Sequence, residues 1–237
     1  MNGRSRSIIL IPTLNEKENL KDLIPQIFGL MPDISILIVD DYSSDGTEEL
    51  MGGFKEKFHN LIFISRKNSF GYGRACVDGF RRVLDNGNFD IIITMDADFS
   101  HDFNAAPALL ENIKSFDVVV GSRYTKGGGV KNWNFFRRTL SKFANLYVKV
   151  ILNLPILDAT TGFNAYRADS LRKLNLDKIN SNGYAFLVEL KYRLFRAGCR
   201  FVEYPILFSE RREGQSKMSR KIIWESIKLP WRLKLFN

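Results

Sequence analysis

Two aspartates separated by one residue, Asp96 and Asp98, follow the short apolar run Ile91–Met95. Such a run predicts a buried strand. Carboxylates at positions i and i+2 after it converge on one hard cation if the chain bends between them. Mg²⁺ or Mn²⁺ held by one or two carboxylates usually completes its coordination shell with substrate phosphates. Alternatively, one aspartate caps the next helix and the other is solvated, and the spacing does not decide between these interpretations.

Polar groups also follow two other apolar runs. Ile34–Val39 ends at Asp40-Asp41, and Ser7–Ile11 is followed by Asn15 and Glu16. An acidic pair at a strand end suits hydrogen bonding to a nucleoside base or ribose. Taken alone, however, the acidic pair favours a simple turn, because turn-forming residues follow it.

The elements that position these groups alternate along the first half of the chain. Expected strands are Ser7–Ile11, Ile34–Val39, Leu61–Ile64, Ile91–Met95 and Val118–Val120, with helical spacing between them, as in Gly73–Leu84 and Ala105–Ile113. This order predicts an α/β fold with a mostly parallel sheet that is covered on both faces. Ligands of such sheets bind beyond the carboxyl ends of the strands, where the polar groups described above would meet.

The pattern changes after Gly121. A long helix is expected at Trp133–Leu152, then a strand near Phe163–Tyr166, a helix at Tyr184–Ala197 and a strand at Arg200–Leu207. No linker or repeat is visible. We therefore expect one domain, residues 1–217, with a C-terminal extension, residues 218–237.

The C-terminal fifth of the chain is strongly basic. The 237 residues carry a net charge of +9, and residues 191–237 hold 12 basic and 4 acidic residues. Ser219–Phe236 combines tryptophans with lysines and arginines, which is typical of a helix in an anionic membrane interface. The alternative is an ordinary helix packed on the domain, and Pro230 is expected to interrupt any long helix there.

Other cations are candidate anion ligands. Arg211–Lys217 contains a flexible glycine and suits closure over a pyrophosphate. Arg123 and Arg137 are further candidates, although a solvated basic surface is the usual explanation for such residues. His101 lies three residues beyond Asp98, and its simplest interpretation is a loop histidine.

Several classes of protein are excluded. Two cysteines exclude a disulfide framework. No apolar run is long enough to cross a bilayer. A composition of 45% hydrophobic and 26% charged residues excludes a disordered or collagen-like chain. The glycines at Gly71 and Gly73 lack the third glycine of a dinucleotide-binding loop, since Cys76 stands in its place.

Together these segments resemble the dolichol-phosphate mannose synthase branch of glycosyltransferase family 2, which comprises inverting enzymes of the GT-A fold. The resemblance covers residues 8 to about 217 and implies a Rossmann-like nucleotide-binding half. The matching segments are Ile11–Glu16, Val39–Thr47, Met95–Asp98, Gly121–Tyr124, Arg137–Asn145, Asp158–Phe163 and Arg211–Lys217.

The resemblance also implies roles for individual residues. Asp96 and Asp98 would bind the metal, Mg²⁺ or Mn²⁺, and the acceptor phosphate would meet Arg123, Arg137 and Ser141. Asp98, Arg123 and Arg137 would be the catalytic residues. The nucleotide-sugar donor would be bound by Pro12, Leu14, Glu16, Ile38, Asp40, Asp96, Ala97, Asp98, Arg211 and Lys217. Leu14 stands where many relatives have an aromatic residue, and Ser100 where well-studied relatives have a glutamine.

The implied activity is transfer of a hexose, mannose from GDP-mannose, onto a polyprenyl or dolichyl phosphate. Alternatives are UDP-glucose or another donor, a non-lipid acceptor, or a non-catalytic module that binds anionic lipid or nucleic acid. The implied location is peripheral, on the cytoplasmic face of a membrane. The implied partners are the membrane surface and membrane-anchoring subunits, with no nucleic acid.

Overall fold

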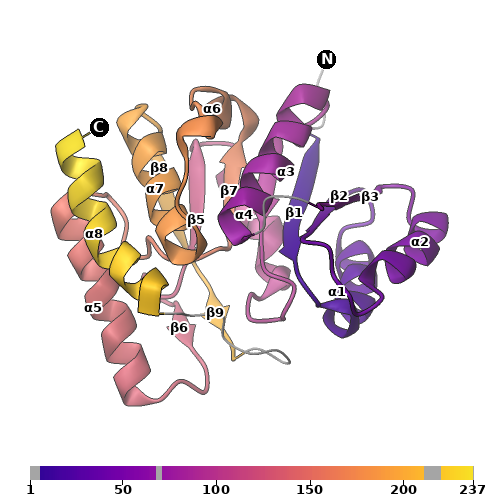
Figure 1. Cartoon of the computed structure of the whole chain (residues 1–237), viewed down its shortest axis with the longest axis horizontal. Helices are drawn as coiled ribbons and strands as arrows, with labels where there is room; N and C mark the ends of the chain where they lie inside the picture. Colours follow the sequence, from indigo (N-terminus) through magenta and orange to yellow (C-terminus); the bar gives the residue numbers. More distant parts are fainter. Residues whose placement is uncertain (1–5, 68–70, 211–219, 237) are drawn as a thin grey trace.

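The fold is described by a computed structural model that covers residues 6–67, 71–210 and 220–236. Within these ranges, seven strands form one sheet in the order β3-β2-β1-β4-β7-β5-β8 (Figure 1). β7 is antiparallel to its neighbours β4 and β5, and the other pairs are parallel. The strands are β1 (Ser7–Thr13), β2 (Ser35–Asp40), β3 (Leu61–Ser65), β4 (Ile91–Thr94), β5 (Val118–Ser122), β7 (Asn164–Arg167) and β8 (Phe201–Pro205). The predicted α/β class and mostly parallel sheet are confirmed.

Helices cover both faces of the sheet. One face packs against α1 (Lys17–Leu30), α2 (Thr47–Lys57) and α4 (Ala106–Asn112). The other packs against α3 (Tyr72–Asn86), α6 (Ala168–Arg172) and α7 (Gly183–Arg196), with α5 (Phe135–Leu152) and α8 (Arg220–Phe236) beyond them. Short 3₁₀ turns occur at Phe103–Ala105 and Leu176–Lys178.

The central strand β1 shows why the apolar runs are continuous. Ile8 and Leu10 belong to one hydrophobic core cluster, and Ile9 and Ile11 belong to the other. All four are fully buried. Successive side chains of a strand point to opposite faces, so a strand with helices on both sides needs apolar residues at every position.

The expected final strand, Arg200–Leu207, is divided in two. β8 ends at Pro205, and β9 (Leu207–Phe208) pairs in parallel with β6 (Gly129–Val130) as a small second sheet. Ile206 joins them, and its N–H donates to the carbonyl of Ser122 at 3.0 Å. The small sheet of β6 and β9 therefore lies beyond the carboxyl end of β5.

α8 contains Pro230 and runs through it, so the prediction that this proline interrupts the helix is wrong. Proline removes one backbone donor and crowds the preceding turn. Leu229 and Leu233, on the same helix, are buried in the core cluster, and α8 contacts both α7 and α5. Most helical stability in proteins comes from such packing, which here offsets the cost of the proline.

α5 and α8 lie side by side at one edge of the molecule (Figure 1). The Tyr147 hydroxyl of α5 donates to the Ile227 carbonyl of α8 at 2.8 Å. No helix in the described parts of the chain is both long enough and apolar enough to span a bilayer.

Candidate active site at the carboxyl edge of the sheet

The two aspartates lie in a bent turn just after β4. Asp98 is 4% exposed, whereas the Asp96 side chain is 31% exposed. The backbone N–H of Ser100 donates to Asp98 Oδ1 at 3.0 Å. Phe99 has φ +58°, in the left-handed region that non-glycine residues rarely adopt. The bend that the i, i+2 spacing requires is therefore present.

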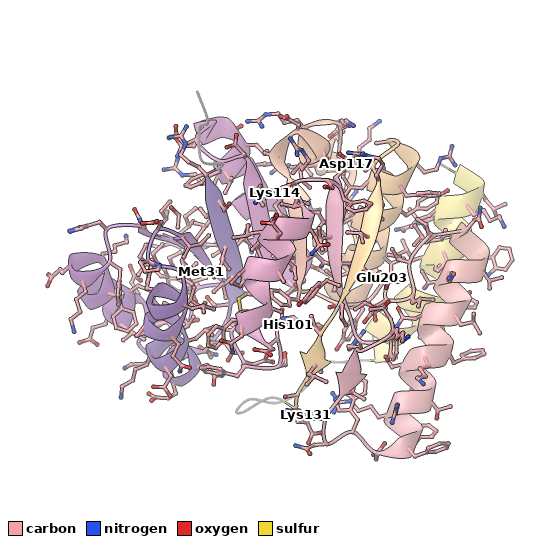
Figure 2. The ribbon with its side chains drawn as sticks, turned by 180° about the vertical axis from the view of Figure 1, so that it is seen from behind. Met31, His101, Lys114, Asp117, Lys131 and Glu203 are labelled. Atoms are coloured by element: carbon pink, nitrogen blue, oxygen red, sulfur yellow. The ribbon has the colours of Figure 1, made fainter. Side chains whose placement is uncertain are left out.

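His101 is buried directly beneath this turn, 2% exposed. Its Nδ1 accepts the Asp96 backbone N–H at 3.0 Å, which leaves the proton of the neutral ring on Nε2. Burial lowers the pKa of His101, although Asp96 and Asp98 oppose this shift. Figure 2 shows His101 toward the same end of the molecule as Lys131, away from Asp117 at the start of β5.

The acidic pair Asp40-Asp41 lies at the end of β2, and both carboxylates accept hydrogen bonds from other residues of the protein. Asp40 is 1% exposed and accepts hydrogen bonds from the Thr13 hydroxyl at 3.1 Å and the Ser43 backbone N–H at 2.8 Å. Asp41 forms a buried ion pair with Arg66 and accepts the Gly71 N–H at 2.7 Å. These contacts shape the loops at this edge, and the nucleoside contact of Asp40 stays a prediction.

The other predicted donor residues differ in exposure. Pro12, Leu14 and Glu16 are partly exposed at the end of β1, and Ala97 is buried in the turn between the two aspartates. Ile38 is fully buried in the core. Arg211 and Lys217 lie outside the described residues.

Arg137, predicted to bind the acceptor phosphate, lies in the first turn of α5. Its side chain is 45% exposed, its guanidinium stacks 4.2 Å from the Trp133 ring centroid, and its Nη1 pairs with Glu210 at 3.0 Å. Ser141 lies one turn further along the helix and accepts a hydrogen bond from the Tyr124 hydroxyl at 2.7 Å. The spacing of four residues places Arg137 and Ser141 on one face of the helix.

Arg123 is buried rather than presented to solvent. It is 5% exposed, and its Nε and Nη2 donate to the two oxygens of Asp158, each at 2.7 Å. Burial disfavours the charged guanidinium, but Asp158 outweighs this effect and raises the pKa of Arg123. The guanidinium also lies 5.3–5.6 Å from the ring centroids of Tyr124, Trp133 and Phe208. Its contact with an acceptor phosphate stays a prediction.

The loop of residues 158–162 connects the two sides of the site. At one end Asp158 binds Arg123; at the other the Gly162 carbonyl accepts the Thr94 hydroxyl of β4 at 2.7 Å. A Cβ on Gly162 would lie 3.3 Å from Asp96 Oδ1 and 2.8 Å from the Tyr72 hydroxyl. Glycine at this position therefore keeps space beside the Asp96 carboxylate.

Lys191 of α7 forms hydrogen bonds to the backbone of this loop. It is fully buried, and its Nζ donates to the carbonyls of Thr161 at 2.8 Å and Ala159 at 3.2 Å. Burial lowers the pKa of Lys191 to about 7, while Asp158 acts in the opposite direction. The loop is thus fixed by the buried Lys191 amine in addition to the Arg123 ion pair.

The donor set at the Asp96–Asp98 turn fits a hard divalent cation. Among the residues that the structure describes, no three His, Cys, Asp or Glu side chains gather as a metal site. The protein would supply carboxylate oxygens from two residues, and phosphate and water oxygens would supply the rest, as is usual for Mg²⁺. The space beside Asp96 at Gly162 is consistent with this arrangement.

The sequence assigned no role to Asp158 or Lys191, and it indicated only that His101 could approach the site from a loop, not that the ring is buried. A signal for Lys191 was present in the sequence. Leu187, Leu190 and Leu194 form an apolar stripe at helical spacing, and Lys191 falls within it. A lysine in the buried stripe of a helix requires polar partners, which points to a structural role.

A Rossmann-like, mostly parallel sheet with paired aspartates at its carboxyl edge is the arrangement of a GT-A glycosyltransferase. The chain belongs to the family described as glycosyl transferase family 2, which matches residues 8–174. It is 40% identical over 222 residues to an undecaprenyl-phosphate mannosyltransferase from Micrococcus luteus, covering 94% of this chain and 91% of the relative. It is 38% identical to a polyprenol monophosphomannose synthase from Mycolicibacterium smegmatis, covering 94% and 84%.

More distant proteins share the fold. A dolichol-phosphate mannosyltransferase from Pyrococcus furiosus is 34% identical over 95% of this chain, which spans 62% of that protein. Glucosyl-3-phosphoglycerate synthase from Mycobacterium tuberculosis, crystallised with Mn²⁺, UDP and phosphoglyceric acid, superposes with a TM-score of 0.68 at 18% identity, covering 95% of this chain and 78% of that one. The same enzyme was also crystallised with Mg²⁺ and UDP.

Proposed function

We propose that the protein transfers a mannosyl group from GDP-mannose to a polyprenyl phosphate with inversion at the anomeric carbon. The named activities of relatives at 34–40% identity support the reaction class. The observation that carries the proposal is the loop of residues 158–162, which joins the Asp96–Asp98 turn to the buried Arg123–Asp158 pair. Donor and acceptor sites would thereby be held at a fixed separation.

The reaction would be a single in-line displacement. An acceptor phosphate oxygen would form the new bond to the anomeric carbon as the bond to the GDP oxygen breaks. A phosphate is already ionised near neutral pH, so no strong general base is needed. Arg137 and Ser141 would orient the phosphate, with Arg123 behind them. Positioning and charge stabilisation would then supply most of the rate.

Asp98, with Asp96, would hold Mg²⁺ or Mn²⁺. The metal would neutralise charge on the departing diphosphate. The side chains at the end of β1 and Asp40 would contact the nucleoside, and Arg211 and Lys217 would pair with the diphosphate oxygens.

The experiment is transfer of radiolabelled mannose from GDP-mannose to a polyprenyl phosphate, with Mg²⁺, Mn²⁺ or EDTA present. We expect metal-dependent labelling of the lipid. A thermal-shift panel of GDP, UDP and their sugars separates the donors, because a ligand that binds only the folded state raises the melting temperature. Stabilisation by UDP-glucose but not by GDP-mannose would contradict the proposed donor.

We further propose that the outer faces of α5 and α8 rest on an anionic membrane surface. Large apolar side chains are exposed along both helices, with basic residues beside them, as suits an interfacial helix. The face continues directly from Arg137, where the lipid phosphate would bind. Its apolar members are Phe135, Phe136, Leu140, Phe143, Leu146 and Val150 on α5, and Ile227, Trp231 and Leu235 on α8. The exposed basic members include Arg138, Lys142, Lys228, Arg232 and Lys234.

Co-sedimentation with vesicles tests this face. We expect binding to vesicles that contain an anionic phospholipid, weaker binding to neutral vesicles, and loss of binding in Phe136→Ser/Phe143→Ser. Leu30→Ser is the matched control, since Leu30 is also exposed, at 41%, but lies at the end of α1. Equal binding by the double variant and the control would refute the membrane role. A peripheral position on the cytoplasmic face, with membrane-anchoring subunits as further partners, is part of the same proposal.

A further inference from the structure

We propose that His101 is a positioning residue: through its hydrogen bond to the Asp96 backbone, it holds the Asp96–Asp98 turn in the conformation that binds the metal. The inference rests on the proposed function, because it assumes that this turn binds the divalent cation. It concerns a residue that touches neither metal nor substrate in the proposed mechanism.

The first support is the direction of the hydrogen bond. His101 Nδ1 accepts the Asp96 backbone N–H at 3.0 Å, and the Asp96 carboxylate oxygen nearest to Nδ1 is 4.0 Å away. The ring therefore binds the backbone of the turn through this nitrogen. Fixing the amide of Asp96 restricts where its side chain can point. It also restricts the backbone of the same turn, which carries Asp98 two residues later.

The second support is the strain of the turn itself. Phe99 adopts φ +58° between Asp98 and His101. A non-glycine residue in this region costs free energy and persists where surrounding contacts hold it. Two such contacts are the Asp96–His101 bond and the Ser209 N–H, which donates to the Ser100 carbonyl at 3.0 Å.

The third support is the packing of the imidazole. Its ring stacks on Phe163 with centroids 5.4 Å apart at 21°, and Phe208 meets it edge-on at 5.4 Å. A Cβ on Gly162 would lie 3.3 Å from His101 Cε1. The ring is thus confined on several sides, so its nitrogen stays aimed at the Asp96 amide.

Two substitutions separate the hydrogen bond from the packing. His101→Phe keeps an aromatic ring between Phe163 and Phe208 but removes the acceptor. His101→Asn loses the ring but keeps an acceptor oxygen near the position of Nδ1. Partners that orient metal ligands typically change metal affinity or activity 10–100-fold when removed.

The measurement is Mn²⁺ binding in the presence of GDP, from the EPR signal of unbound Mn²⁺. We expect the dissociation constant for Mn²⁺ to rise about 10-fold or more in H101F and to be lower in H101N than in H101F. H101N should bind Mn²⁺ more tightly than H101F even if H101N has the lower melting temperature. GDP affinity in EDTA should change less than about twofold in both variants, because their nucleoside contacts are intact. His59→Asn, at an exposed histidine, is the control and should match wild type.

The outcomes are distinguishable. If H101F binds Mn²⁺ as tightly as wild type, or if the two variants bind equally, the hydrogen bond does not position the turn and the inference is wrong. If Mn²⁺ affinity follows only the loss of thermal stability, His101 is merely structural. If wild type with GDP binds no Mn²⁺, the metal assignment itself fails, and the inference fails with it.

Discussion

Two halves of the molecule hold their charged groups differently. The half that we propose to bind the donor (the donor half) is β1–β4 with α1–α4, and the half that we propose to bind the acceptor (the acceptor half) is β5–β9 with α5–α8. In the donor half the buried carboxylates of Asp40 and Asp98 accept N–H groups from Ser43 and Ser100, three and two residues further on. In the acceptor half, Arg123 pairs with Asp158, 35 residues away in the sequence.

This difference shows where each half is vulnerable. The carboxylates of Asp40 and Asp98 each accept a backbone N–H of their own loop, so an isosteric substitution there should alter chemistry more than the fold. The acceptor arginines depend on long-range contacts, on an exposed helix face and on the loop of residues 158–162. Changes there should therefore affect substrate affinity, membrane binding or stability.

The largest effect is expected at Asp98. Asp98→Asn keeps the shape of the side chain but removes the charge that would bind the metal, so we expect kcat to fall roughly 10²–10³-fold, as for loss of a key electrostatic contact. The melting temperature should change little. The control is Asp102→Asn, at an exposed position four residues further on. Full mannosyl transfer by D98N would remove Asp98 from the proposed mechanism.

Arg137 should give the next largest effect, and on a different kinetic parameter. Arg137→Ala removes a charge-assisted hydrogen bond of about 1.5–3 kcal/mol, so we expect the KM for the polyprenyl phosphate to rise about 10–100-fold. The KM for GDP-mannose should be unchanged. Arg82→Ala removes an exposed arginine of α3, away from the proposed membrane face, and should behave as wild type. An unchanged acceptor KM in R137A would assign the phosphate to other residues.

Gly162 tests the connection between the halves. Gly162→Ala places a Cβ 2.8 Å from the Tyr72 hydroxyl and 3.3 Å from Asp96 Oδ1. We expect a loss of about 1–3 kcal/mol in the free energy of unfolding, as for overpacking, together with weaker Mn²⁺ binding. Gly53→Ala is the control: its Cβ would meet nothing within 4 Å on helix α2, so it should be neutral or slightly stabilising. Wild-type stability in G162A would show that the loop shifts at no cost.

Lys191 should give the smallest effect, visible mainly as a dependence on pH. Burial lowers its pKa to about 7, whereas the ordinary lysine value is 10.5. Between these values the unfolded chain binds the proton and the folded chain does not. Wild-type stability should therefore gain up to about 1.4 kcal/mol per pH unit from this group as pH rises above 7.

Lys191→Met should lack that gain. Urea unfolding of wild type and K191M at pH 7 and pH 8.5 measures it as a widening difference between the two proteins. Lys114→Met, at a side chain 66% exposed, is the control and should run parallel to wild type. Parallel behaviour of K191M would show that Lys191 titrates normally.

Local patterns were enough to predict most of the donor half. The apolar runs that became β1, β2 and β4 end within two residues of the predicted positions, with Asp40 the last residue of β2 and Asp98 in the turn after β4. The two signals are the continuous apolar run and the turn-forming residues that follow it. Both can be recognised from neighbouring residues, because a strand buried on two faces must be apolar and the chain must turn where the strand ends. The interpretation of Asp40-Asp41 as turn residues agrees with the hydrogen bond from the Ser43 N–H to Asp40. Asp41 differs, because its partners Arg66 and Gly71 lie 25 and 30 residues further on.

The acceptor half was less predictable because its determinants are distant in sequence. Nothing near Arg123 indicates that Asp158 neutralises it. The same holds for His101 of the donor half, because nothing near it in the sequence indicates the flanking rings of Phe163 and Phe208 from the acceptor half. The error at Pro230 has the same origin. Local sequence argues against a helix there, and the packing of Leu229 and Leu233 overrides it.

The strand order has a consequence for synthesis on the ribosome. The first four strands are neighbours in the β3-β2-β1-β4 block, so the nucleotide-binding part can begin to fold from sequence already emerged. β5 lacks its outer neighbour until β8 has been translated, and α5 lacks its partner until α8 follows. Since domains tend to fold in the order of synthesis, the apolar surface of α5 would stay incomplete longest. A nascent chain would thus pair its first four strands before the face shared by α5 and α8 is complete.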